Sequence, residues 1–254
     1  MSDQLQHNEA KDPWWGLRKF TNARIAIGRA GVSVPTGESL AFSLAHAFAR
    51  DAVYDRLEVE GSRLEISRLH LCVVLHSRAE NRNQYLQRPD LGRRLNDESL
   101  EELRTLAGHY DICITVADGL SATAVNHHAV PLLNVLIPAM RSAGWSLSPV
   151  CIVEQGRVAV SDETGATLNA KLSIILIGER PGLSSPDSLG IYLTYGPAIG
   201  NTDERRNCIS NINANGLSYE AAADKVMYLV SESLRLKLSG VMLKDSSGLL
   251  GEGL

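Results

Sequence analysis

The chain has 254 residues, 44% of them hydrophobic, and a formal net charge of −4 at pH 7. This length suits one large domain, or a compact domain with an appendage. The slight acidic surplus argues against a nucleic-acid partner, because such proteins usually carry a basic surplus on the binding face. The N-terminus has no apolar segment of signal-peptide length, and no stretch approaches the roughly 18 apolar residues of a membrane span. We therefore expect a protein of the cytoplasm.

The N-terminal quarter of the chain predicts a mobile tail followed by a helical appendage. Residues 1–17 begin with a polar stretch, and we expect them to be mobile. Within residues 18–68, apolar side chains recur at helical spacing between Leu40 and Phe48, and Thr36 is a candidate N-cap. The expectation is a smaller helical region in front of the main domain.

From residue 69 onward, β-rich and helical segments alternate. Strands are predicted at residues 69–75, 111–117, 148–154, 172–177 and 190–195, and helices at residues 96–106, 122–143 and 218–237. The alternation predicts an α/β fold with a Rossmann-like, mostly parallel sheet flanked by helices and a smaller helical N-terminal appendage. We assign this domain to residues 69–244 and expect residues 245–254, which are rich in glycine and serine, to form a flexible tail.

Individual residues set the expected limits of the helices. Asn96 and Ser218 stand at the N-cap positions of the helices that follow them. Pro131 and Pro138 lie inside the helix predicted at residues 122–143. Because proline removes a helical hydrogen bond, we expect these two residues to kink or break that helix.

The carboxyl ends of the predicted strands are the expected location of a ligand site, because ligands of parallel α/β sheets bind there. This rule directs attention to the loops that begin at Asp118, Glu154 and Gly178. No glycine-rich dinucleotide fingerprint and no phosphate-binding loop follows any predicted strand. The sequence therefore disfavours a dinucleotide-dependent enzyme and a kinase.

The four cysteines are far apart in the sequence and form no Cys-x-x-Cys pair. Cys72, Cys113 and Cys151 lie inside apolar runs, where we expect reduced, buried cysteines that act as small hydrophobic residues. Cys208 differs because polar residues surround it, and we expect the chain to turn there.

The sequence offers little machinery for nucleophilic or metal catalysis. Ser121 follows a predicted strand, yet the Gly-x-Ser-x-Gly elbow is missing, so a helix N-cap is the favoured role. His127 and His128 are adjacent in a predicted helix. Because adjacent helical residues point in different directions, we do not expect these two to bind one metal ion together.

Glu179 is the acid of greatest interest, because it directly follows a fully apolar strand and precedes a turn with Pro181 and Gly182. Two roles are open. The carboxylate can accept hydrogen bonds from a ligand in the crevice, each worth about 1.5–3 kcal/mol, or it can pair with Arg180 or another arginine. A similar ambiguity holds for three further arginines, which could be solvated or could contact a partner: Arg88, Arg93 and Arg94.

Five short segments together resemble one family. They are residues 28–31 (GRAG), 85–95 (YLQRPDLGRRL), 117–122 (ADGLSA), 178–183 (GERPGL) and 208–212 (CISNI). Their order and spacing, from about residue 18 to residue 243, resemble the small (light) subunit of ethanolamine ammonia-lyase. Each motif is short, but five in register on matching predicted elements are specific.

The resemblance implies binding of adenosylcobalamin between this chain and a large TIM-barrel subunit, which holds the substrate ethanolamine and carries the catalytic residues. Carried over by motif, three residues are implied to contact the cofactor: Val158, Glu179 and Cys208. The family's corrinoid keeps its own base on cobalt, and no Asp-x-His-x-x-Gly motif occurs here, so we expect no metal ligand on this chain. Further candidates for cofactor contact are Asp118, Ser121, Arg93 and Arg94.

The implied reaction converts ethanolamine to acetaldehyde and ammonia through a 5′-deoxyadenosyl radical, with this chain gripping and shielding the cofactor. An alternative function is a corrinoid-binding or scaffolding module without lyase activity, and a third is an independent hydrolase that uses Ser121 and a histidine. Family members with a longer N-terminal region are linked to bacterial microcompartments. Only about 17 residues precede the matched region here, which argues against microcompartment targeting, so we expect the open cytoplasm and keep a microcompartment as the alternative.

Overall fold

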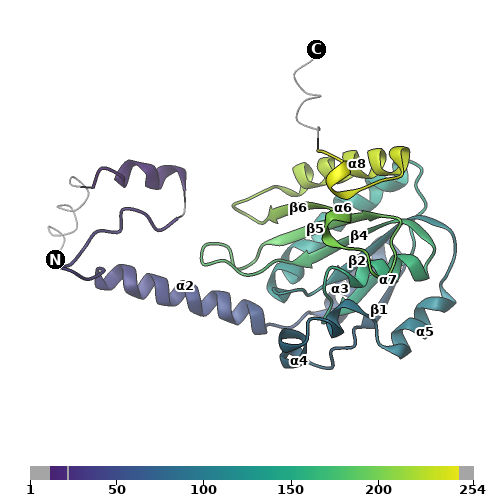
Figure 1. Cartoon of the computed structure of the whole chain (residues 1–254), viewed down its shortest axis with the longest axis horizontal. Coiled ribbons are helices and arrows are strands. Elements are labelled where there is room, and N and C mark those ends of the chain that lie inside the picture. The colour runs from purple at the N-terminus through teal and green to yellow at the C-terminus, as the bar shows by residue number, and fades with distance from the viewer. Residues whose placement is uncertain (1–11, 22, 246–254) are drawn as a thin grey trace, which may run out of the picture.

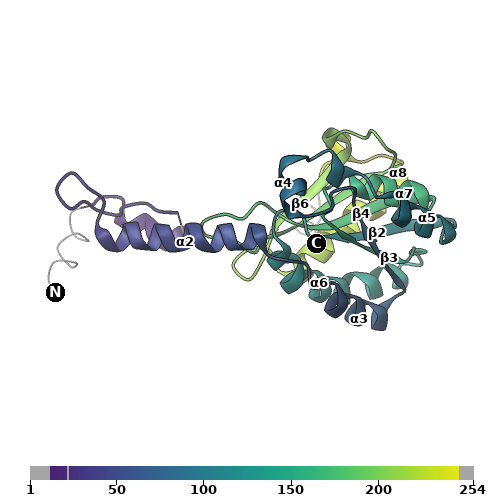
Figure 2. The same cartoon turned by 90° about the horizontal axis from the view of Figure 1, so that it is seen from below.

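The structure, a computed structural model, describes residues 12–21 and 23–245. Most of the two tails expected at residues 1–17 and 245–254 lies outside these residues. The described part is an α/β fold whose six-stranded sheet has the order β1-β3-β2-β4-β5-β6 (Figures 1 and 2). The predicted fold class is therefore confirmed.

Four strands of the sheet are parallel, and two antiparallel strands extend it. The strands are β1 (Cys72–His76), β2 (Tyr110–Ala117), β3 (Val150–Glu154), β4 (Ala170–Gly178), β5 (Leu189–Tyr195) and β6 (Arg206–Ile212). β1, β3, β2 and β4 pair in parallel, whereas β5 pairs antiparallel with both β4 and β6. β6 was not predicted, so the expectation that the chain turns at Cys208 is wrong, because this residue lies within a strand.

Helices cover both faces of the sheet. They are α2 (Thr36–Tyr54), α3 (Val59–Leu69), α4 (Arg82–Gln87), α5 (Asp97–Thr105), α6 (Ala122–Ser142), α7 (Val160–Thr167) and α8 (Tyr219–Leu236). One core cluster joins the sheet to α3, α6 and α8, and a second cluster on the opposite face joins it to α5 and α7. The parallel strands are apolar along nearly their whole length because both faces are covered.

α6 runs through both of its prolines without interruption, so of the predicted kink or break at Pro131 and Pro138 the break is wrong. Each internal proline costs about 3 kcal/mol. Buried side chains on both sides of these residues, among them Leu132, Leu136 and Met140, offset that cost by packing against the sheet.

Side-chain caps fix the starts of several helices as predicted. The Asn96 side chain accepts from the Ser99 amide at 2.9 Å, and the Ser218 hydroxyl accepts from the Ala221 amide at 3.2 Å. Thr36 is an exception, since it is the first residue of α2 and Pro35 occupies the cap position. The proline backbone, with φ −54° and ψ 139°, supplies the extended conformation that the cap position requires.

α2 projects away from the sheet, and both views show this helix standing clear of the sheet and its covering helices over most of its length (Figures 1 and 2). Its apolar side chains are open to solvent, with Leu40 66%, Leu44 56% and Phe48 55% exposed. α3 behaves differently, because Ile66 is fully buried and the helix packs on the sheet. No helix within residues 12–21 and 23–245 is long and apolar enough to cross a membrane.

Candidate functional site

The connections after β2 and β3 leave the sheet toward opposite faces, β2 toward α6 and β3 toward α7. Such a switch point opens a crevice at the carboxyl ends of the strands. A cavity of about 430 Å³ lies there, and its lining includes Gly119 after β2, Val158 after β3, Glu179 after β4, and Tyr192 of β5. The structure therefore brings two of the three predicted contact residues, Val158 and Glu179, to one cavity.

Glu179 is held by uncharged partners. Its Oε2 accepts from the Ser188 hydroxyl at 2.6 Å and from the Asn211 amide at 3.3 Å, and its own amide donates to the Ser188 carbonyl at 2.9 Å. Within the described part of the chain it forms no ion pair, with Arg180 or any other arginine, and its Oε1 has no hydrogen-bond partner. One carboxylate oxygen thus stays available at the cavity.

Two glycines, one in each loop, allow the loops after β2 and β4 to approach each other closely. Gly119 has φ +59°, and a Cβ on it would lie 2.3 Å from the carbonyl oxygen of Gly178. The Leu120 amide donates to that same carbonyl at 3.0 Å. Only glycine fits such a close approach with a left-handed backbone, which explains the glycine in the ADGLSA segment.

Asp118 joins the ends of β2 and β3 and does not line the cavity that holds Glu179. It is buried and accepts hydrogen bonds from the backbone amides of Gly119, Gln155 and Gly156 at 2.9–3.0 Å. The Arg82 guanidinium lies 3.7 Å from its carboxylate. Burial raises the pKa of Asp118 to about 6 against these stabilising contacts. The role of this residue is to hold the strand ends in place.

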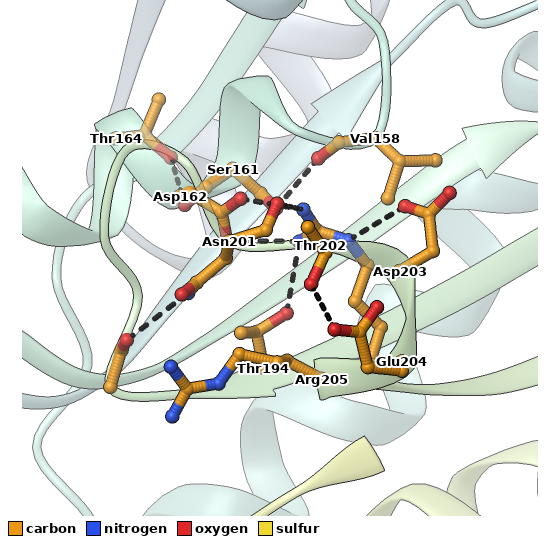
Figure 3. Close-up of polar contacts among 12 residues, drawn as sticks. Val158, Ser161, Asp162, Thr164, Thr194, Asn201, Thr202, Asp203, Glu204 and Arg205 are labelled. Carbon is orange, nitrogen blue, oxygen red and sulfur yellow. Dashed lines mark hydrogen bonds and ion pairs between the residues drawn. The ribbon is translucent and has the colours of Figure 1, made fainter. Parts of the chain in front are cut away.

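Val158 and Cys208 lie on the same face of the sheet as Tyr192. The Val158 side chain packs on the α5 and α7 side, and its carbonyl accepts from the Ser161 hydroxyl at 2.9 Å (Figure 3). Cys208 is opposite Tyr192 in the β5–β6 pair, so the two side chains point to one side. Burial raises the pKa of Tyr192 to about 12, with Cys208 adding to the shift. Cys208 itself is exposed and does not line the cavity.

The segments that carry Val158 and Cys208 are joined by a buried ion pair. Asp162, in the first turn of α7, accepts two hydrogen bonds from Arg206 at the start of β6, at 2.7 and 2.9 Å. Figure 3 shows Asp162 among the polar residues of the β5–β6 connection, including Asn201 and Asp203.

Comparison with known proteins gives one consistent result. The family model described as "Ethanolamine ammonia-lyase light chain (EutC)" matches residues 11–244. The chain belongs to this family. It is 53% identical to the ethanolamine ammonia-lyase small subunit of Pseudomonas syringae pv. tomato, over 98% of this chain and 90% of the relative. It is 52% identical to that of Ralstonia nicotianae, over 97% and 94%, and 53% identical to that of Azotobacter vinelandii, over 97% and 93%.

Membership of the light-chain family makes the protein an ammonia-lyase subunit, and the hydrolase hypothesis fails on geometry as well. Ser121 is fully buried, its hydroxyl accepts from the Ala124 amide at 3.2 Å as the N-cap of α6, and it donates to the Pro186 carbonyl at 2.9 Å. A hydroxyl engaged in this way inside the fold cannot attack a substrate.

The arginines of the YLQRPDLGRRL segment have separate roles in this light chain. Arg94 donates to the buried carboxylate of Glu163 at 2.8 and 3.0 Å, so it anchors α7. Arg88 pairs with its neighbour Asp90 on the surface at 2.7 Å. Arg93 is exposed, and its side chain makes no hydrogen bond or ion pair with other described residues.

The sequence assigned no role to two residues that line the cavity, Tyr85 and Arg157, or to Arg82 beside them. Tyr85 is fully buried between two guanidinium groups, with Arg82 4.6 Å and Arg157 4.1 Å from its ring centroid. Such stacking is favourable by about 0.5–2 kcal/mol for each pair. Tyr85 and Arg82 belong to the short helix α4, which carries no strong helical periodicity, and only the fold brings Arg157 to them.

Proposed function

We propose that this light chain binds adenosylcobalamin together with a large subunit, in an ethanolamine ammonia-lyase that converts ethanolamine to acetaldehyde and ammonia. The observation that carries the proposal is the cavity at the strand ends, where Glu179 presents an unbonded carboxylate oxygen beside Val158 and Tyr192. The relatives are named as small subunits of this lyase, which supports the same conclusion.

The cavity offers a hydrogen-bond acceptor, which fits the rim of a corrinoid because that rim carries many amide groups. Amide N–H groups donate to carboxylates, and Glu179 Oε1 is a free acceptor within the described residues. Val158 and the Tyr192 ring add apolar surface for the ring system. The cavity, about 430 Å³, is of drug-ligand size and smaller than a corrinoid requires. This chain would therefore cover one side of the cofactor and leave the other side to a second protein.

Adenosylcobalamin supplies the radical chemistry when it is bound. The residues of this chain have a simpler task. Glu179 orients the cofactor through a charged hydrogen bond, and Ser188 and the Asn211 amide fix the carboxylate in place. The close packing of the loops at Gly119 and Gly178 keeps this part of the cavity lining rigid.

α2 is the surface that we propose for the large subunit. Its exposed leucines and phenylalanines form an apolar surface, on which the Arg24 guanidinium lies 5.6 Å from the ring centroid of Phe42. Apolar surface of this kind on a projecting helix is typical of a protein interface. The assembly would work in the cytoplasm, and a microcompartment location would show as co-sedimentation with compartment shells.

The test is co-expression of the chain with a candidate large subunit, followed by cobalamin binding and ethanolamine deamination. We expect activity only from the pair. Glu179→Gln removes a charged acceptor and should weaken cobalamin binding by about 10- to 150-fold, the equivalent of 1.5–3 kcal/mol. Glu101→Gln, an exposed acid on α5, is the control and should leave binding unchanged. Deamination by the single chain, or equal cobalamin affinity of the two variants, would refute the proposal.

A further inference from the structure

Two histidines and an aspartate gather where α6 meets the loop between β4 and β5. His127 Nδ1 lies 3.9 Å, and His128 Nε2 3.6 Å, from Oδ2 of Asp187. One ligand atom from each residue lies within 4.8 Å of the other two. The two adjacent rings meet edge-on, with 6.0 Å between centroids, so one nitrogen of each lies near the other although the residues follow one another in the helix, contrary to our expectation from helix geometry. The aspartate, which comes from a distant segment, lies within reach of both, and the sequence could not place it there.

His128 carries the argument, because its side chain is only 8% exposed and one of its nitrogens has no partner. Its Nδ1 lies 2.7 Å from the Tyr219 hydroxyl. Its Nε2 is buried without a hydrogen bond from any described residue, since 3.6 Å to Asp187 is too long. Buried polar atoms rarely lack a partner, so an unmet Nε2 aimed at a carboxylate points to a missing ligand.

We propose that His127, His128 and Asp187 bind a divalent transition-metal ion, with Zn²⁺ as the best match. Two imidazoles and one carboxylate are a common zinc donor set, with water in the fourth position. Metal–ligand bonds of about 2.0–2.2 Å place the donor atoms of a tetrahedral site roughly 3.3–3.5 Å apart. The two imidazole–carboxylate separations here exceed that range by little. His127 and Asp187, whose side chains are 60% and 33% exposed, have room to move and shorten these two distances to that range.

Tyr219 orients the buried ligand. When its hydroxyl accepts the Nδ1 proton of His128, the lone pair of Nε2 is free for the metal. An ion here would tie together three segments: α6, the loop that begins at Glu179, and the start of α8 through Tyr219. In the described structure that loop is already fastened to Ser121 by the hydrogen bond to the Pro186 carbonyl. The metal would strengthen this attachment and order residues 179–188.

The test uses the full-length chain without an affinity tag, stripped with a chelator and titrated with Zn²⁺ and Co²⁺. We expect one ion per chain, with a dissociation constant at or below the micromolar range, and a visible Co²⁺ spectrum typical of low coordination number. His127→Ala and Asp187→Asn should each weaken Zn²⁺ binding at least tenfold, and Tyr219→Phe about tenfold, the lower limit for loss of an outer-shell partner. His109→Ala, an exposed histidine outside the cluster, should bind like the wild type.

A second measurement follows the loop. Bound Zn²⁺ should slow proteolysis within residues 179–188 of the wild type and have no effect on Asp187→Asn. Circular dichroism checks that the variants fold, because Asp187 and Tyr219 are partly buried. Absence of stoichiometric binding overturns the proposal, and so does equal Zn²⁺ affinity of wild type and Asp187→Asn, the outcome expected of adventitious binding to surface histidines. Binding without protection of the loop would overturn the proposed ordering of residues 179–188.

Discussion

Asp162 and Arg206 face each other in the protein interior, joined by two nearly parallel hydrogen bonds, and each side chain is only 2% exposed. Asp162 follows Val158 by four residues, and Arg206 precedes Cys208 by two. The pair therefore sets the position of one candidate cofactor contact relative to the other. A buried charge pair of this kind adds little net stability against an apolar pair, but removing one partner is costly.

Asp162→Ala should lower the free energy of unfolding by about 3–5 kcal/mol, because it leaves the Arg206 guanidinium buried without its main partner. Urea unfolding of the purified chain measures this. The matched control is Asp203→Ala, since Asp203 also contacts Arg206, at 3.3 Å, but is 98% exposed. That change should cost less than about 1 kcal/mol. Equal losses of unfolding free energy in the two variants would show that the buried pair contributes no more to stability than the exposed one.

The adjacent residues Arg93 and Arg94 allow a second comparison. Arg94→Ala leaves the carboxylate of Glu163, only 2% exposed, with the Leu95 amide as its remaining hydrogen-bond donor among the described residues. We expect a loss of about 2–4 kcal/mol of unfolding free energy, somewhat reduced because Arg94 is 35% exposed. Arg93→Ala removes an exposed side chain and should change stability by less than about 0.5 kcal/mol. Thermal or urea unfolding separates the two, and a reversed order would contradict the assigned roles.

The parallel part of the sheet could be predicted because its strands are continuous apolar runs separated by capped helices. β6 could not, because Asn207, Ser210 and Asn211 have low strand propensity. Pairing with β5 overrides that propensity. The same limit explains the error in α6: nothing local to this helix reveals the packing that tolerates Pro131 and Pro138.

The candidate site was predictable in part. Topology pointed to the strand ends, and the family resemblance selected Val158 and Glu179, which the structure places at one cavity. The partners of Glu179 could not be found in advance. Ser188 and Asn211 reach it only because β5 pairs antiparallel with β4 and β6 pairs antiparallel with β5, and such pairing leaves no local signal in the sequence.

The proposed docking role of α2 predicts a variant that folds but assembles poorly. Leu44→Glu places a charge on the projecting helix, where the leucine is 56% exposed and contributes little to the fold. If the large subunit buries this side chain, loss of about 1.5–3 kcal/mol should weaken assembly about 10- to 150-fold. His46→Glu adds the same charge at an exposed polar position and should have the smaller effect. Co-purification and analytical ultracentrifugation measure assembly, and unchanged assembly of Leu44→Glu would exclude this surface.

Asp118 predicts a specific pH dependence of stability. Burial raises its pKa to about 6, from 3.8 for an ordinary aspartate, so between these values the folded chain holds a proton that the unfolded chain releases. Its contribution is fully present below about pH 4 and is lost as pH rises through about 6, a fall of about 3 kcal/mol. Asp118→Asn removes this component. Urea unfolding at several pH values should show the wild-type curve falling relative to the variant across that window, and parallel curves would contradict the raised pKa.

A variant at Gly190 tests how precisely the Glu179 carboxylate must be positioned for cobalamin binding. A Cβ at Gly190 would lie 3.0 Å from Oε1 of Glu179, so Gly190→Ala should push the unbonded carboxylate oxygen by a few tenths of an ångström. We expect cobalamin binding in the two-subunit complex to weaken about fivefold, the equivalent of about 1 kcal/mol for a distorted hydrogen bond. Gly182→Ala, in the loop between β4 and β5, adds a Cβ with no contact closer than 3.6 Å and is the matched control. In Glu179→Gln, where the charged bond is already lost, Gly190→Ala should have little further effect. A full fivefold loss in that background would mean that Gly190 acts on the cofactor by another route.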